Sequence, residues 1–214
     1  MSEMMRSTVI FAVLGLASTI MAQSDQHLPM LNADEQGRIQ AGEIVIREIE
    51  TEQEKGQAVE TMGLMSVSGE ILVRLLTDYE SYPEFMSAVE KIEIVEKAGE
   101  QTTLNYILRP MLGLTKKYRI KIAPVQLDEK VWKIEWHLVT WPGLGEMETI
   151  GDTQGYWLII EESPTRSFVQ YFVYSDPGYV PFGLGSIVDA LGKSSIEEVF
   201  METRTHAGKI AGKD

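Results

Sequence analysis

The sequence predicts an α+β fold in which a curved antiparallel sheet wraps around one long C-terminal helix. Three observations support this prediction. Two strand-like segments open the domain, about six more follow a short helical region, and an amphipathic stretch closes the chain. Because short turns rich in glycine, proline and acidic residues separate the later segments, we expect consecutive strands to pair as an antiparallel meander.

Composition indicates one globular domain. The chain has 214 residues, of which 44% are hydrophobic and 24% charged, and both fractions are ordinary for a folded protein. The formal net charge of -13 repels phosphate backbones and anionic lipid head groups, so we expect no nucleic-acid partner. The absence of cysteine excludes disulfides, thiolate nucleophiles and cysteine metal ligands.

Residues 1–22 have the pattern of a signal peptide. Arg6 precedes the apolar run Val9–Ala17, which is too short to span a bilayer comfortably. Cleavage is expected after Ala22, with Ala17 as the alternative site, and an uncleaved anchor is the competing interpretation. We therefore expect export across the inner membrane, into the periplasm if the host is a bacterium. A polar segment (23–41), the domain (42–208) and a C-terminal tail (209–214) follow.

The domain is expected to begin with two strands and a bent helical region. Ile44, Ile46 and Ile49 lie among charged residues, which predicts a half-exposed strand. The acidic stretch 50–56 predicts a hairpin loop before a second strand at 58–67. Ser68 is a plausible N-cap for the amphipathic helix that follows. A second short helix is expected over 81–86, because Pro83 favours the first helical position.

The rest of the domain is predicted to be strands and one helix. Alternation places Leu104, Tyr106 and Leu108 on one face of their strand. The closing segment, residues 182–208, has an apolar stripe at helical spacing and predicts the longest helix. The expected strands are Lys91–Glu96, Thr102–Arg109, Lys117–Gln126, Val131–Thr140, Gly155–Glu161 and Ser167–Tyr174.

The stretches Leu75–Tyr79 and Tyr82–Met86, together with Gly155–Trp157, resemble the START-like superfamily. Within it they are most similar to the branch that groups polyketide cyclase/dehydrases with coenzyme Q-binding proteins. The resemblance covers residues 42–208 and implies the helix-grip fold with an interior cavity. It says less about function, because this fold hosts carriers, enzymes and interaction modules.

Few residues suggest catalysis. His137 alternates out of phase with its apolar neighbours Trp136 and Leu138, so it is expected to face solvent. The three histidines are scattered without metal-ligand spacing, and no phosphate-binding loop or nucleophile elbow occurs. We therefore expect no catalytic residue, no metal and no cofactor.

A set of inward-facing residues is expected to line the cavity, although plain core packing is the alternative for each of them. A strongly curved sheet around a helix leaves a volume that suits an apolar ligand. Arg109, at a strand end, is the candidate for orienting a ligand head group. The cavity candidates are Tyr106, Arg109, Tyr118, Trp136, Trp157, Phe172, Ile187 and Leu191.

The loop over residues 177–183, named the mouth loop below, is apolar and rich in proline and glycine. In START-like folds a loop before the last helix lies near the cavity mouth. We expect its residues Tyr179, Val180, Pro181 and Phe182 to form a gate or to touch a membrane transiently. A loop packed against the domain is the alternative.

The leading functional hypothesis is an exported, non-enzymatic binder or carrier of a hydrophobic small molecule, such as a lipid or a quinone-like compound. The quinone suggestion comes from the resemblance alone. A cyclase- or dehydratase-like enzyme that uses the same cavity is the first alternative, and a protein-interaction module is the second. An enzyme needs polar groups that converge inside the cavity, whereas the strand pattern places mainly apolar residues there.

Overall fold

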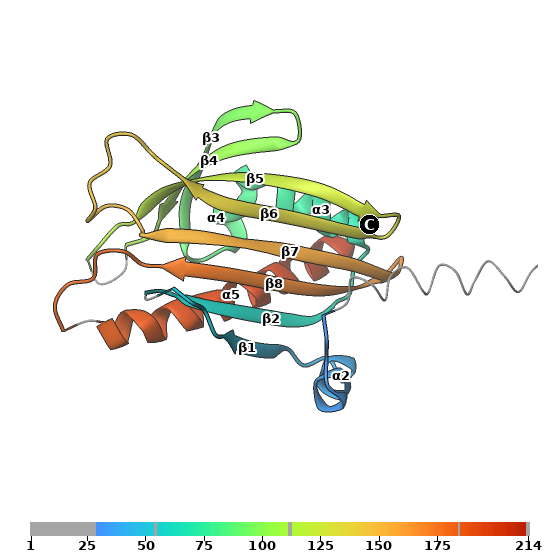
Figure 1. Cartoon of the computed structure of the whole chain (residues 1–214). Helices are drawn as coiled ribbons and strands as arrows, with labels where there is room; N and C mark the ends of the chain where they lie inside the picture. The colour runs from blue at the N-terminus through green and yellow to red at the C-terminus, as the bar shows by residue number, and fades with distance from the viewer. Residues whose placement is uncertain (1–28, 54, 111–112, 184, 213–214) are drawn as a thin grey trace, which may run out of the picture.

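A computed structural model describes residues 29–53, 55–110, 113–183 and 185–212. Eight strands form a single sheet in the order β1-β2-β8-β7-β6-β5-β4-β3, and every neighbouring pair is antiparallel (Figure 1). The α+β class and the meander are therefore confirmed. The strands are β1 (Val45–Ile49), β2 (Gln57–Met65), β3 (Val89–Ala98), β4 (Gln101–Leu108), β5 (Lys117–Asp128), β6 (Val131–Val139), β7 (Asp152–Ser163) and β8 (Arg166–Asp176).

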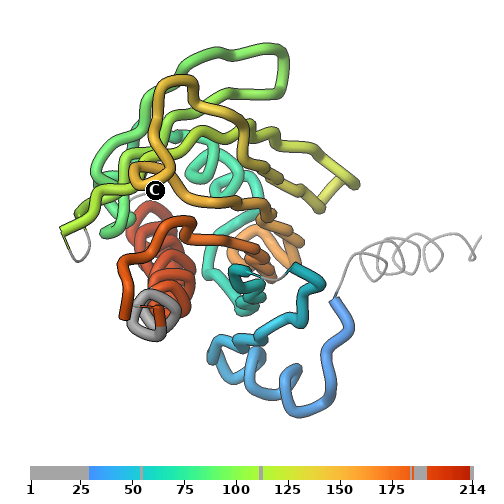
Figure 2. The backbone as a smooth tube through the Cα atoms, turned by 60° about the vertical axis from the view of Figure 1, so that its left-hand side comes forward, coloured from blue at the N-terminus to red at the C-terminus, as the bar shows by residue number. Residues whose placement is uncertain are grey.

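The sheet curves around the C-terminal helix α5 (Gly185–Ala211), as the tube in Figure 2 shows. The helix begins at Gly185 rather than at Phe182 and extends to Ala211 rather than Gly208. Phe200 of α5 is completely buried, and its ring stacks on that of Trp157 with the centroids 6.1 Å apart. This contact fixes the helix against the inner face of the sheet, the concave side that faces α5.

The helical region between β2 and β3 closes one end of this core. It contains α3 (Gly69–Thr77), the short 3-10 helix η1 (Tyr79–Ser81) and α4 (Tyr82–Phe85). The Ser68 side chain accepts a hydrogen bond from the Ile71 amide, which confirms the predicted N-cap. The Tyr82 hydroxyl donates to the Leu76 carbonyl at 2.6 Å, so the bend is held by a buried hydrogen bond.

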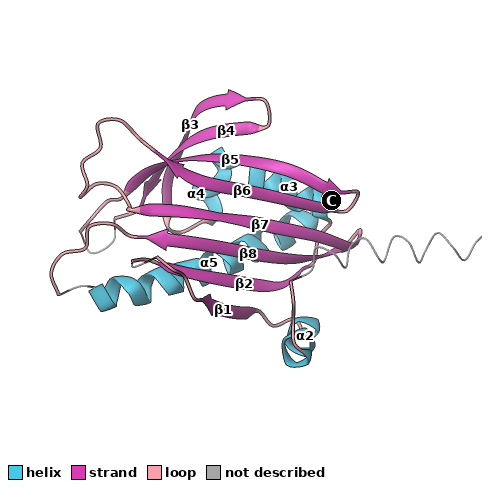
Figure 3. Cartoon of the chain, viewed as in Figure 1, coloured by secondary structure: helices cyan, strands magenta, loops and turns pink. Residues whose placement is uncertain are grey.

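The helix α2 (Ala33–Gln40) lies within the polar segment 23–41, for which no helix was predicted (Figure 3). A capping box starts it: the Asn32 side chain accepts from the Glu35 amide, and the Glu35 carboxylate accepts from the Asn32 amide. Ile39 of α2 is buried in a second, smaller core on the outer, convex face of the sheet. The predicted signal peptide, residues 1–22, lies outside the described residues.

An ion pair anchors α2 to the sheet. The Arg47 guanidinium on β1 donates to both carboxylate oxygens of Glu35 and also pairs with Glu60 on β2 at 3.2 Å. Hydrogen bonds from the Arg47 side chain, and then from the Asn32 backbone, lower the pKa of Glu35 from 4.5 to about 2. The first turn of α2 is therefore tied to the sheet by a carboxylate that stays ionised in mild acid.

We expect Glu35→Gln to lower the melting temperature near neutral pH, with a gap from the wild type that closes in acid. A carboxyl whose pKa is depressed on folding stabilises the fold above its unfolded pKa, and this contribution is lost as the pH falls. For Glu35 this stabilisation is lost as the pH falls from 4.5, the ordinary pKa of the group, to about 2, its pKa in the folded protein. Thermal melts at a series of pH values measure the gap.

The control for this prediction is Glu43→Gln, which breaks the exposed pair between Arg38 and Glu43. Exposed pairs contribute little, so this change should leave the melting temperature almost unaltered at every pH. The difference in melting temperature between the wild type and Glu35→Gln could instead stay constant from neutral pH to strong acid. That result would show that the charge of Glu35 does not cause the difference.

Candidate functional site

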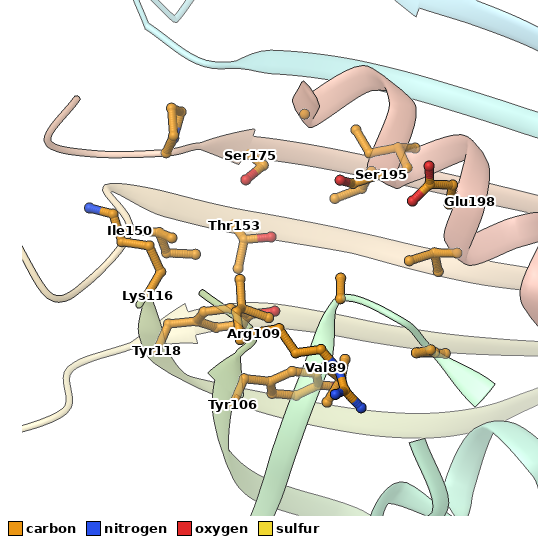
Figure 4. A pocket seen from close by; sticks show the side chains of 18 of the residues that line it. Val89, Tyr106, Arg109, Lys116, Tyr118, Ile150, Thr153, Ser175, Ser195 and Glu198 are labelled. Atoms are coloured by element: carbon orange, nitrogen blue, oxygen red, sulfur yellow. The ribbon is translucent and has the colours of Figure 1, made fainter. Parts of the chain in front are cut away.

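A cavity of about 530 Å³ lies between the inner face of the sheet, the helix α5 and the mouth loop. Its volume falls within the range of small-molecule binding sites. Strands β4 to β8 supply most of one side, and residues 192–199 of α5 supply the other. Figure 4 shows side chains from both sides pointing into the same space. The lining is mainly apolar, so water inside it is easily displaced by an apolar ligand.

Stacked aromatic rings form the floor of the cavity. Trp157 and Tyr171 stack with centroids 4.1 Å apart, and Trp136 stacks on Tyr171 at 5.8 Å. Gly155 makes this arrangement possible, because a Cβ atom there would lie only 2.5 Å from Cζ2 of Trp136. The six-membered ring of the Trp136 indole therefore packs directly against the backbone of β7 at Gly155.

A second aromatic pair lines the cavity from the neighbouring strands β4 and β5. The rings of Tyr106 on β4 and Tyr118 on β5 stack with their centroids 5.0 Å apart, because the two residues are paired in register. Burial raises the pKa of both phenols, and it raises the pKa of Tyr171 in the same way. These hydroxyls stay protonated near neutral pH. They can donate hydrogen bonds to a ligand but cannot act as bases there.

The charged side chains that line the cavity are accessible to solvent, since Arg109 and Glu198 are exposed and Lys116 is half-buried. Among the described lining residues the cations are Arg109 and Lys116, and the single carboxylate is Glu198. In Figure 4 Arg109 lies on the wall formed by Tyr106, Tyr118 and Val89, whereas Glu198 lies across the cavity on α5. The Glu198 carboxylate accepts a hydrogen bond from the Ser194 hydroxyl at 3.2 Å. No histidine is among the described lining residues.

Lys116 joins the two loops that border the mouth. Its ammonium donates to the carbonyl of Thr149 at 2.8 Å and to that of Tyr179 in the mouth loop at 3.1 Å. Burial lowers the pKa of Lys116, and the Asp176 carboxylate partly opposes this effect. Asp176 in turn accepts a hydrogen bond from the Gly178 amide at 2.8 Å. The base of the mouth loop is thus held by charged groups rather than by apolar packing.

The tip of the mouth loop is exposed and apolar. Phe182 is fully exposed and Tyr179 is 48% exposed. Val180 and Pro181 line the cavity. An apolar surface that continues from the outside of a protein into its cavity is typical of sites that exchange a hydrophobic ligand or contact a membrane.

The structure brings together five of the eight predicted cavity residues: Tyr106, Arg109, Tyr118, Trp136 and Trp157 all line the cavity. Phe172 does not. It lies on the outer face, where its ring stacks on that of Tyr156 with the centroids 5.4 Å apart. The side chains of Ile187 and Leu191 lie outside the described residues. The mouth-loop residues Tyr179, Val180 and Pro181 line the cavity, whereas Phe182 is not among its lining residues.

Sequence reasoning missed several lining residues. Tyr171 and Val173 line the cavity in place of Phe172, because β8 presents its odd-numbered residues to the inner face. Both faces of β8 carry large apolar side chains, so alternation alone did not select the inner one. Ile120 and Ile122 also line the cavity. Alternation places them on the same face of β5 as Tyr118, so the sequence pattern could have identified them.

Within the described residues, no cluster of three or more histidine, cysteine or acidic side chains is placed to hold a metal ion. Nor does the described part of the chain contain a helix with the length and apolar character needed to cross a membrane.

Comparisons with known proteins found similarity to solved structures but none to protein families or curated sequences. Neither protein-family models nor curated protein sequences match this chain. Among solved structures, a STAR-related lipid transfer protein from Xanthomonas axonopodis is similar with a TM-score of 0.65 at 12% identity, over 83% of this chain and 96% of its own. Human StAR-related lipid transfer protein 5 is similar with a TM-score of 0.60 at 11% identity, over 93% of this chain and 100% of its own.

The Zhui aromatase/cyclase from Streptomyces sp. R1128 is also similar, with a TM-score of 0.58 at 11% identity, over 77% of this chain and 95% of its own. At such low identities these likenesses establish the fold and not the activity. The chain therefore has the helix-grip fold that these START and cyclase structures share.

Proposed function

We propose that this protein binds a hydrophobic small molecule in its cavity and carries it without covalent chemistry. The observation that carries the proposal is the cavity itself, with a volume of about 530 Å³ and a mainly apolar lining beneath an exposed apolar loop. Similarity to lipid transfer proteins supports it. A lipid is the first candidate ligand, and the resemblance to coenzyme Q-binding proteins adds a quinone-like compound.

Binding accounts for the cavity better than catalysis does. Acid–base chemistry needs a group that exchanges protons near neutral pH within reach of the substrate. The buried phenols of Tyr106, Tyr118 and Tyr171 have raised pKa values, and Glu198 on α5 is exposed to solvent. The similarity to an aromatase/cyclase keeps a cyclase-like enzyme as the alternative.

Native mass spectrometry of protein purified from the envelope fraction of its own host tests the proposal, followed by organic extraction of any bound compound. We expect a co-purifying hydrophobic molecule, whose mass gives its class. The proposal fails if the protein is recovered without a ligand and takes up neither lipids nor quinones added in excess. Recovery from the envelope rather than the cytoplasm tests the proposed export.

The mouth loop is proposed to make a transient membrane contact through which the ligand is exchanged. Because the net charge of the chain is -13, the contact is expected with neutral phosphatidylcholine vesicles. We expect the double variant Val180→Ser, Phe182→Ser to bind such vesicles at least about tenfold more weakly, since burial of a phenylalanine contributes about 1.5–3 kcal/mol. Vesicle co-sedimentation measures binding, and the melting temperature should change little because Phe182 is fully exposed.

The matched control is Val125→Ser, Leu127→Ser, which removes two exposed apolar side chains from β5. This change should leave vesicle binding intact. Equal binding by the wild type and the mouth-loop variant would mean that this loop is not the membrane contact.

A further inference from the structure

The size of the cavity limits the ligand. A volume of about 530 Å³ holds about 18 groups the size of a water molecule, at about 30 Å³ each. A methylene group is of similar size, so one acyl chain of ordinary length with a small head group fills the space. A phospholipid with two such chains needs roughly twice that volume. The cavity volume therefore matches a single-chain lipid better than a complete two-chain one.

The distribution of polarity gives the ligand a direction. The deep part of the cavity is lined by Trp157, Tyr171 and Ile122, all of which belong to the main hydrophobic core. Charged side chains stand near the edge, where Arg109 follows the end of β4. A ligand with one apolar tail and one polar head satisfies both ends, because its tail displaces water and its head group reaches the charged edge.

Arg109 determines the sign of the head group. Its backbone amide is fixed by a hydrogen bond to the Ala88 carbonyl at 2.9 Å, and its side chain lines the cavity. None of the ion pairs within the described residues involves this guanidinium. Lys116, the other cation, already donates to two loop carbonyls. The Glu198 carboxylate lies across the cavity on α5 (Figure 4).

We infer that the ligand is a single-chain anionic amphiphile, such as a long-chain carboxylic acid, whose head group pairs with Arg109. This inference rests on the proposed function and specifies its ligand class. A guanidinium binds a carboxylate through two parallel N–H···O hydrogen bonds, and such charge-assisted bonds are about twice as strong as neutral ones. The tail lies over the aromatic floor, where Trp136 and Trp157 report its arrival.

The test is a titration of the purified protein, followed by tryptophan fluorescence, with three probes. These are hexadecanoic acid, hexadecan-1-ol and dipalmitoylphosphatidylglycerol, which is anionic but has two chains. We expect the acid to bind at least about tenfold more tightly than the alcohol, because only the acid forms charge-assisted bonds with the guanidinium. The phosphatidylglycerol should bind much more weakly than the acid. Added salt should reduce the preference for the acid, since Arg109 is exposed to solvent.

Arg109→Gln should remove the preference of the protein for the acid and leave its affinity for the alcohol unchanged. The control is Arg74→Gln, which makes the same change of charge at an exposed position of α3, away from the cavity. This variant should bind all three probes like the wild type. A variant that is merely destabilised would lose affinity for both the acid and the alcohol, whereas Arg109→Gln should lose affinity only for the acid.

The possible failures are distinct. Equal affinities for acid and alcohol, or an Arg109→Gln variant that keeps its preference for the acid, would overturn the assignment of an anionic head group. Tight binding of the phosphatidylglycerol would overturn the single-chain limit. Absence of binding for all three probes would count against the proposed function itself.

Discussion

Replacement of Phe200 by alanine is expected to destabilise the protein by about 3–5 kcal/mol, the range found when a buried phenylalanine is truncated to alanine. The side chain is completely buried. It stacks on Trp157 of β7, and a Cβ atom added at Gly63 of β2 would lie 3.4 Å from its ring. The ring thus joins α5 to two strands, and its removal leaves a void between the helix and the sheet.

Urea denaturation measures this effect, with Met201→Ala as the control. Met201 is the next residue of α5 and is 40% exposed, so its truncation should change the free energy of unfolding by little. Since the whole stability of a domain is about 5–15 kcal/mol, Phe200→Ala should shift the urea midpoint strongly. A shift no larger than that of Met201→Ala would mean that α5 is held to the sheet by other contacts.

The second large effect is expected at Gly155, where structure and site depend on the same missing side chain. A Cβ atom there would lie 2.2 Å from the carbonyl oxygen of Phe172 on β8 and 2.5 Å from the ring of Trp136. The first of these atoms belongs to the backbone and cannot turn aside. Gly155→Ala should therefore destabilise the protein by about 1–3 kcal/mol, as overpacking of a core does.

The same substitution should weaken ligand binding. If Trp136 is lifted from the backbone of β7, its ring moves into the cavity and occupies space that the ligand needs. We expect hexadecanoic acid to bind Gly155→Ala at least about tenfold more weakly than the wild type. A displaced indole would occupy cavity volume that several methylene groups of the ligand need. Urea denaturation and the tryptophan titration measure the two consequences separately.

Gly37→Ala is the control for this change. Gly37 lies in α2, and a Cβ atom there would have no neighbour within 4 Å. Alanine should stabilise the helix by about 0.5–1 kcal/mol and leave ligand binding unchanged. If Gly155→Ala proved as stable as the wild type and bound the acid equally well, the close packing of Trp136 against Gly155 would not be what keeps the cavity open.

Most of the sheet could be predicted from the sequence because its signals are local. Period-two alternation identified β4, β5 and β6, and turns containing glycine or proline separated many of the strands. Ser68 was identified as an N-cap because capping depends on residues within one turn. The same rule could have found α2, since Asn32 and Glu35 form a capping box. It was missed because the segment is short and polar, so its apolar stripe is weak.

The candidate site was harder to predict. Tyr106, Tyr118 and Trp136 were identified because their strands alternate clearly. Trp157 was also among the candidates, although its strand does not alternate, and all four residues line the cavity. Phe172 was placed on the wrong face because β8 is apolar on both sides. Its outer face packs in the smaller core beneath α2, where Phe168 is buried beside Ile39. Because α2 covers part of the outer face, β8 can carry apolar residues on that face as well.

The sequence by itself determined the elements, their order and the apolar character of the interior, because these follow from periodicity, capping and turn residues close together in the chain. Only the tertiary structure decided that the interior is not filled. The cavity is the space that remains between β4 to β8 and α5. Two contacts help to define it: Trp136 packs against the backbone at Gly155, and Phe200 of α5 stacks on Trp157 of β7. Such a volume is set by residues far apart in sequence, so no local pattern encodes it.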